Sequence, residues 1–394
     1  MRHHACNRRA FLRWGVTLAA TAPFAFASRT EPLAVESKPA AKGPRTRSDA
    51  KVAIVSCPSY GPEVQTALRE CFDLLGGIGS LVKNKTVTVK VNLTGTNFAR
   101  FMERPVGETY MTHYSTALAL TTLLLGAGAR RVRLVESTQS KANLETTLGF
   151  ADWDVNALKA LGKVEFENTR NLGSSKSYGH LRVPTQGYMF SSFDFNRAYE
   201  DTDVMVSLAK LKNHLTAGVT LSMKNLFGIT PNALYGEQAG NEDATEGRSP
   251  LHSSVGFEHI RLPGLKEGVT SKDSTYRVPR IVTDICTARP IHLAIIDGIT
   301  SMSGGEGPWC QEAKPIKVTT PGVLIAGLNP VSTDAVGTAV MGYHDPRTAR
   351  GTKPFDFCDN HLLLAEQAGL GAAGLGEIEV RGMSIARAQY RYDV

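Results

Sequence analysis

The chain has 394 residues, with 44 lysines and arginines, 37 aspartates and glutamates, and a formal net charge of +7. Four of the positive charges, Arg2, Arg8, Arg9 and Arg13, stand in the first 27 residues, which contain no acidic residue, so the rest of the chain has a charge of +3. A balance this close to neutral argues against a nucleic-acid-binding protein, in which basic residues concentrate in a stripe.

The N-terminal segment has the pattern of an export signal. Arg8-Arg9 stand before Phe11-Leu12, and an apolar stretch over residues 14–27 follows. This stretch is too short for a membrane span, which needs roughly 20 apolar residues. Ala25-Phe26-Ala27 is a small-x-small cleavage site. The paired arginines resemble a twin-arginine signal; an ordinary secretory signal with two chance arginines is the alternative.

We therefore expect a signal peptide over residues 1–27 and export by the twin-arginine machinery to the periplasm or another location outside the cytoplasm. After cleavage we expect no transmembrane helix. Residues 28–50 are rich in proline, alanine and charge and lack apolar periodicity, which predicts a flexible linker before a domain over residues 51–394.

Six cysteines stand at positions 6, 57, 71, 286, 310 and 358, without a Cys-x-x-Cys pair. Zinc and iron–sulfur sites need clustered thiolates, so the spacing indicates neither. Five cysteines remain after signal cleavage. One or two disulfides are open in an oxidising compartment, with at least one thiol left free or paired between chains.

From residue 51 onward, strand-like apolar runs alternate with helix-like ones, which predicts an α/β domain with a mostly parallel sheet and helices on both faces. By size, one domain or two lobes fit. Residues 231–280 lack periodicity and are predicted to form a long irregular insertion, typical of lids and binding loops. The expected strands are 52–55, 87–91, 132–135, 204–208, 293–296 and 323–326, and the expected helices lie near 63–75, 115–127, 217–227, 332–341 and 360–369.

Residues 203–231 concentrate more chemistry than any other stretch. Lys210, Lys212 and His214 recur at every second position, so they share one face if the preceding strand continues through them. The predicted helix that follows contains Lys224. The segment predicts a cationic pocket beside a helix N-terminus, where a carboxylate, a phosphate or an anionic cofactor binds well. The alternative is a structural network in which internal carboxylates pair with the lysines.

Polar residues also follow the other predicted strands, and ligands of open α/β sheets bind at the carboxyl ends of strands. Asp297 is placed to act as a base or a metal ligand, whereas Asp334 is a weak metal candidate that could instead complement a helix dipole. Glu306 lies in a glycine-rich loop that matches neither the dinucleotide fingerprint nor the P-loop. The residues at these ends are Lys90, Asn92, Glu136, Asp297, Glu306 and Asp334.

Residues 210–214 and 218–228 resemble the signature of the family called domain of unknown function 362. The resemblance covers most of residues 51–382, in the expected order, and implies no settled activity. Some members have a ferredoxin-like module, and this chain has no cysteines in that spacing. The supporting segments are 89–93, 296–299, 305–308, 332–336, 361–371 and 377–382.

Two functions fit these observations, beside a purely structural role in which the lysines pair with carboxylates within the fold. The first is an exported enzyme that binds a small anionic substrate or cofactor, with His214 moving a proton near neutral pH. The alternative is a non-catalytic periplasmic binding or cofactor-carrying protein that serves a redox partner. The cofactor stays open, as does any metal beyond the weak candidates Asp297 and Asp334. The predicted catalytic residues are His214, Lys212 and Asp297, and the predicted binding residues are Lys90, Asn92, Lys210, Lys224, Asn225 and Glu306.

Overall fold

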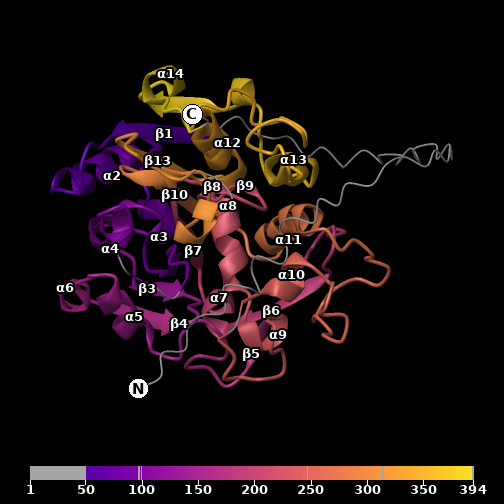
Figure 1. The fold of residues 1–394 in the computed structure, drawn as a ribbon. Helices are drawn as coiled ribbons and strands as arrows, with labels where there is room; N and C mark the ends of the chain where they lie inside the picture. The colour runs from indigo at the N-terminus through magenta and orange to yellow at the C-terminus, as the bar shows by residue number, and fades with distance from the viewer. Residues whose placement is uncertain (1–49, 96–97, 99, 246, 313–314, 393–394) are drawn as a thin grey trace. The chain divides into compact units, whose positions relative to one another are not determined.

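An eight-stranded sheet crosses the protein, in the order β14-β1-β13-β10-β7-β2-β3-β4 (Figure 1). β13 runs antiparallel to both of its neighbours, β1 and β10, whereas all other neighbouring pairs are parallel. The predicted mostly parallel α/β sheet is therefore confirmed. The strands are β1 (Lys51–Ser56), β2 (Thr86–Lys90), β3 (Arg131–Glu136), β4 (Val164–Asn168), β7 (Val204–Lys210), β10 (Leu293–Gly298), β13 (Val323–Gly327) and β14 (Glu379–Gly382).

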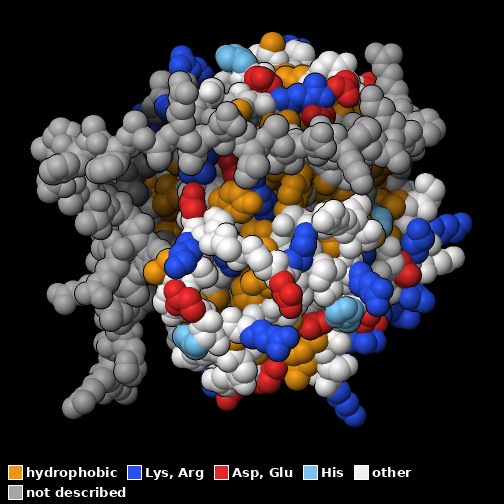
Figure 2. All heavy atoms as spheres, turned by 90° about the vertical axis from the view of Figure 1, so that its right-hand side faces the viewer, with side chains coloured by type: hydrophobic (Ala, Val, Ile, Leu, Met, Phe, Trp, Pro, Cys, Tyr) orange, Lys and Arg blue, Asp and Glu red, His pale blue; other side chains and the backbone are white. Residues whose placement is uncertain are grey.

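This computed structural model describes residues 50–95, 98, 100–245, 247–312 and 315–392. The predicted signal peptide, almost all of the predicted linker and Cys6 lie outside the described residues. All described residues belong to one compact unit. On the side of the molecule that carries α11, basic and acidic side chains are interspersed (Figure 2).

Helices cover both faces of the sheet (Figure 1). α2 (Glu63–Leu74) and α4 (Tyr114–Gly126) pack on one face, and α8 (Leu221–Asn225), α11 (Ser274–Ala288) and α12 (Pro330–Val340) pack on the other. β2, β7, β10 and β13 are buried along their whole length, since both faces are covered. Each layer of helices therefore encloses its own hydrophobic core.

Shorter elements connect these layers. The helices are α3 (Gly79–Val82), α5 (Leu144–Phe150), α6 (Val155–Ala160), α7 (Arg197–Glu200), α9 (Asn232–Tyr235), α10 (Ser249–His252), α13 (His361–Gln367) and α14 (Ile385–Ala388). Four 3₁₀ turns are η1 (Val106–Glu108), η2 (Leu226–Ile229), η3 (Pro308–Glu312) and η4 (Leu375–Glu377). Three two-stranded sheets pair β5 (Tyr178–Arg182) with β6 (Ser192–Asn196), β8 (Asn213–His214) with β9 (Gly218–Val219), and β11 (Ser301–Ser303) with β12 (Lys317–Thr319).

The segment after β7 differs from the prediction. β7 ends at Lys210, so Lys212 and His214 do not continue its face. The chain instead forms the β8–β9 hairpin, and the helix expected from residue 217 begins at Leu221. Gly218 has φ +73°, and a Cβ there would lie 2.7 Å from the carbonyl oxygen of Pro354. Only glycine fits this position, and the close approach ties the hairpin to the C-terminal region.

Residues 231–280 are largely irregular, as predicted, with the short helices α9 and α10 inside them. The sequence prediction did not include the 15-residue helix α11. Pro279 lies inside this helix, and an internal proline removes one backbone hydrogen bond, which makes the sequence look unsuited to a helix.

The reversed direction of β13 corrects the expected convergence of strand ends. Parallel strands end at one edge of the sheet, where the chain leaves β2 at Lys90, β3 at Glu136 and β7 at Lys210. β13 ends at the opposite edge. Asp334 therefore does not lie at the carboxyl edge with the other predicted residues, and it belongs to α12 instead.

Candidate functional site

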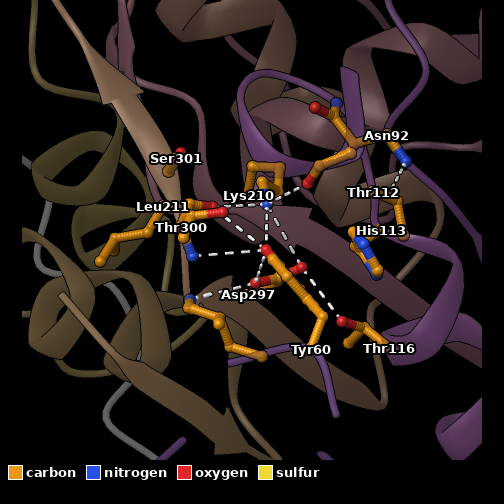
Figure 3. A network of polar contacts seen from close by, with 12 residues as sticks. Tyr60, Asn92, Thr112, His113, Thr116, Lys210, Leu211, Asp297, Thr300 and Ser301 are labelled. Atoms are coloured by element: carbon orange, nitrogen blue, oxygen red, sulfur yellow. Dashed lines mark hydrogen bonds and ion pairs between the residues drawn. The ribbon is translucent and has the colours of Figure 1, made fainter. Parts of the chain in front are cut away.

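Lys210 and Asp297 form a buried ion pair between neighbouring strands (Figure 3). Lys210 Nζ lies 3.3 Å from Asp297 Oδ2, and neither side chain is exposed. The same amine donates to the carbonyl oxygens of Gly107 and Thr300, at 2.8 and 2.7 Å, and to Tyr60 Oη at 2.7 Å. Burial lowers the pKa of Lys210, while the Asp297 charge opposes that shift.

Donors surround the carboxylate of Asp297. Tyr60 Oη donates to Oδ1 at 2.9 Å, Thr116 Oγ1 to Oδ2 at 3.1 Å, and the Ile299 amide to Oδ1 at 3.1 Å. The His113 ring stacks on Tyr60 with 3.6 Å between ring centroids. The geometry is that of an internal ion pair on the face that α2 and α4 cover, and a catalytic role for Asp297 stays a prediction.

Lys90 and Glu136 form a second buried pair on the neighbouring strands β2 and β3, with 2.5 Å between Lys90 Nζ and Glu136 Oε1. Glu136 also accepts the amides of Leu93, at 2.6 Å, and Ser137, at 2.9 Å. Lys90 Nζ donates to the carbonyl oxygen of Val91 at 2.7 Å. Both charges are therefore compensated within the fold.

Asn225 connects α8 to the sheet. Its Nδ2 donates to the Lys90 carbonyl oxygen at 3.2 Å and to Ser207 Oγ at 3.1 Å. Its Oδ1 accepts from Asn92 Nδ2 at 2.9 Å and from Lys90 Nζ at 3.4 Å. The amide group of Asn225 is saturated by the protein, so a binding role for Asn92 and Asn225 stays a prediction.

Lys212 is held by carbonyl groups alone in the described hydrogen bonds. Its Nζ donates to the carbonyl oxygens of Tyr110, at 2.5 Å, and Glu306, at 2.9 Å. The residue is 1% exposed. Burial lowers the pKa of Lys212 to about 7, because the nearby Glu306 charge compensates the lost hydration only in part.

Lys224 lacks even such carbonyl partners. Its amine lies 4.4 Å from the centroid of the Phe227 ring, and no hydrogen bond between described residues involves it. The residue is 9% exposed. Burial lowers the pKa of Lys224 to about 7. Among the lysines of the predicted site, Lys224 is therefore the one whose charge the protein compensates least.

Glu306 and His214 lie beside one another, with 3.9 Å between Glu306 Oε2 and His214 Nδ1. Burial lowers the pKa of His214 well below its usual value, so the ring is neutral at pH 7. Burial alone would raise the pKa of Glu306, but His214, the Leu215 amide and Lys224 outweigh it and lower that pKa to about 2. The amide of Thr216 donates to His214 Nδ1 at 3.2 Å, which assigns the proton of the neutral ring to Nε2.

Three residues that the sequence prediction did not single out lie near Lys224. Arg248 donates to the carbonyl oxygens of Thr230 and Gly228, and its charge lowers the pKa of Lys224 after burial. Unlike the exposed His259, His252 is half-buried, with its ring centroid 5.0 Å from that of Phe227.

His361, at the start of α13, is the third residue near Lys224 that the sequence prediction did not single out. It is fully buried, and neither ring nitrogen makes a hydrogen bond of ordinary geometry with a described residue, although the Ala217 backbone favours the protonated ring. Burial and then the charge of Lys224 lower the pKa of His361 to about 3 and that of His252 to about 4. Together with His214, these residues place three neutral imidazoles around Lys224. Arg248 and His252 come from the irregular region and His361 from a distant helix, so no local pattern could have indicated them.

The expected anion site at a helix N-terminus is occupied by the protein itself. Asp334 accepts the first amides of α8, from Ser222 at 2.9 Å and Met223 at 2.8 Å, and the Ser222 hydroxyl at 2.5 Å. Burial raises the pKa of Asp334 to about 7. Asp334 therefore complements the dipole of α8, not of its own helix.

The described residues contain no group of three or more histidine, cysteine, aspartate or glutamate side chains placed to hold a metal ion. Asp297 and Asp334 are each engaged as described above. Of the five described cysteines, Cys57, Cys71, Cys286 and Cys310 are free thiols, and these four and Cys358 are buried. In the same part of the chain, every helix is too short or too polar to cross a bilayer.

Comparison with known proteins places this site in a family context. Over 189 residues the chain is 29% identical to the thylakoid-associated protein sll1697 of Synechocystis sp.. The matched region covers 46% of this chain and 51% of that protein. The chain thus spans about half the length of this curated relative. A crystal structure of a protein from Thermotoga maritima superposes with a TM-score of 0.35 and 14% identity, over 64% of this chain and 53% of that one.

The family model described as Domain of unknown function (DUF362) matches residues 87–339. The matched range is more than half of the chain, and it includes Lys90, Lys210, Lys224 and Glu306. The protein therefore belongs to the DUF362 family.

Proposed function

We propose that this protein is an enzyme that binds a small anionic ligand at Lys224. The observation that supports it is the Lys224 amine, which belongs to a residue only 9% exposed and makes no hydrogen bond with a described residue. The surrounding charges support it as well, because two cations, Arg248 and Lys90, and one carboxylate, Glu306, act on the Lys224 amine.

An anion would remove the imbalance. Burial of an ammonium is costly, and the lowered pKa values of Lys212 and Lys224 express that cost, which the Glu306 charge offsets only in part. A phosphate or carboxylate at Lys224 would raise both pKa values and give the ammonium a charge-assisted hydrogen bond. His361 lies near the same amine and would supply a ring N–H donor to a remaining ligand oxygen, whereas the N–H of the neutral His252 ring already donates to the Arg248 carbonyl oxygen.

The pairing of His214 with Glu306 supports catalysis over simple binding. A neutral imidazole beside an ionised carboxylate can take up a proton and be stabilised as the cation. His214 would then move a proton to or from the bound anion. The pairs Lys210–Asp297 and Lys90–Glu136 would hold the strands that position this group.

The binding site is tested by anion-dependent thermal stability. Inorganic phosphate or succinate should stabilise the protein, by about 2.7 kcal/mol at a concentration 100 times the dissociation constant. Lys224→Gln should abolish that gain, and Lys163→Gln, at an exposed position, should retain it. Equal responses of the wild type and Lys224→Gln to both anions would overturn the proposal.

Native mass spectrometry of the exported protein separates the enzyme from the non-catalytic carrier. A carrier should copurify with a stoichiometric small molecule, and His214→Ala should keep that molecule bound. An enzyme should release its product, and its turnover should be lost in His214→Ala.

We also propose export by the twin-arginine route, which rests on Arg8 and Arg9 in the N-terminal sequence. Replacing both arginines by lysine should leave the precursor in the cytoplasm. Unchanged export of the double variant would instead indicate the general secretory route.

A further inference from the structure

A pocket of about 360 Å³ opens beside His214, on the side of the β8–β9 hairpin. Its volume falls in the range of small-molecule sites, roughly 300–1,000 Å³. A smaller hollow of about 70 Å³ near Phe150 includes none of the predicted site residues. The larger pocket is lined by Asn213, His214, Leu215, Gly218, Ser303, Gly304, Pro315, Lys317, Tyr343, Lys353, Pro354, Asp356, Phe357, Cys358 and Tyr392.

Two tyrosines form fixed aromatic walls of this pocket. Tyr343 Oη accepts a hydrogen bond from Asn213 Nδ2 at 2.9 Å. Tyr392 Oη donates to the carbonyl oxygen of Leu211 at 2.7 Å and accepts from Thr319 Oγ1 at 3.0 Å. Because both hydroxyl groups are anchored to the segment after β7 or to β12, the rings keep their positions beside the cavity.

Phe357 completes the aromatic lining at the rim, where it is 58% exposed. The exposed Lys353 adds a positive charge to the lining. The charge of Lys224 acts on His214, so the two residues lie close together.

We propose that this pocket binds the organic part of the ligand, a planar aromatic group, with the anionic group directed past His214 toward Lys224. This inference rests on the proposed function and names the class of ligand as an aromatic anion. His214 belongs to both the pocket lining and the Glu306 pair, so it stands where the two parts of such a ligand join.

The C-terminal wall of the pocket comes from residues 343–392, beyond the residues 87–339 that the family model matches. His214 and Lys224, where we place the anionic group, lie inside the matched range. The segment after residue 339 would therefore select the organic group, while the matched part of the chain would bind the charge.

The test compares phenyl phosphate with methyl phosphate, which share the phosphate group and differ in the ring. By isothermal titration calorimetry, the wild type should bind phenyl phosphate at least about tenfold more tightly, because the ring buries apolar surface in the pocket. Phe357→Ala should reduce that advantage by roughly fivefold or more, with methyl phosphate affinity within about twofold of the wild type. Phe150→Ala is the matched control, since Phe150 is equally exposed (61%) but lies at the other hollow.

Each of the other outcomes contradicts a specific part of the proposal. Equal affinities for the two phosphates would overturn the pocket assignment and leave the anion site at Lys224 intact. If Phe357→Ala and Phe150→Ala change the preference for phenyl phosphate to the same extent, the ring binds elsewhere. That result would also overturn the pocket assignment. If neither phosphate binds the wild type, both this inference and the proposed function fail.

Discussion

Lys90 Nζ and Glu136 Oε1 lie 2.5 Å apart between two parallel strands, with 2% and 3% of their side chains exposed. We predict that Lys90→Met lowers the free energy of unfolding by about 3–5 kcal/mol, because it leaves a buried carboxylate without its counter-charge. Urea denaturation measures the change. The double variant Lys90→Met/Glu136→Gln should recover part of the loss. A double variant less stable than Lys90→Met alone would show that the uncompensated charge is not the cause.

Asp334 connects α12 to α8 through the amides of Ser222 and Met223. Asp334→Asn replaces one accepting oxygen by an NH₂ group, which faces a backbone N–H donor in the same place. We expect a loss of about 1–3 kcal/mol in the free energy of unfolding, measured by chemical denaturation. Asp152→Asn, at an exposed position with φ 61°, is the matched control and should change little. Equal stabilities of the two variants would contradict the capping role.

The lowered pKa of Lys224 predicts a pH-dependent stability. The folded pKa is about 7, below the unfolded value of about 10.4, so above pH 7 the unfolded chain binds more protons and the folded state gains stability as pH rises. Relative to Lys224→Met, the wild type should gain up to about 1.4 kcal/mol per pH unit between pH 7 and 8.5. Guanidinium denaturation at several pH values gives both curves. Parallel curves would show that Lys224 titrates normally.

Binding of an anion should be coupled to proton uptake. Sulfate keeps its charge across this pH range, so a change in its affinity reports on the protein. Above pH 7, Lys224 must be reprotonated to bind sulfate, and the affinity should fall by up to about tenfold per pH unit. Calorimetry at pH 8 in buffers with different ionisation enthalpies should show uptake of about one proton. Sulfate binding that is independent of pH would place the anion away from Lys224.

The sheet was predictable because its central strands are buried on both faces and appear in the sequence as continuous apolar runs. The direction of β13 could not be predicted, because an apolar run does not indicate which way a strand runs in the sheet. α11 was missed because of Pro279. The alternation from Lys210 to His214 indicated a strand, but the hairpin that forms depends on the contact of Gly218 with Pro354, more than 130 residues away in the sequence.

For the candidate site too, the local sequence indicated the residues but not their partners from distant segments. The sequence pattern singled out the lysines and His214 because charged side chains between apolar residues are unusual in a buried segment. It did not reveal that Asp297 and Glu136 pair with Lys210 and Lys90. These pairings depend on which strands become neighbours, and strand order is a property of the whole fold.

Because a carboxylate already occupies the first turn of α8, an incoming ligand would meet titrating amines in place of backbone dipoles. Backbone dipoles hold their polarity at every acidity, whereas an amine that releases its proton near neutrality does not. Capture of a ligand by this protein would therefore follow the acidity of its surroundings, with retention in mildly acidic solution and release in alkaline solution.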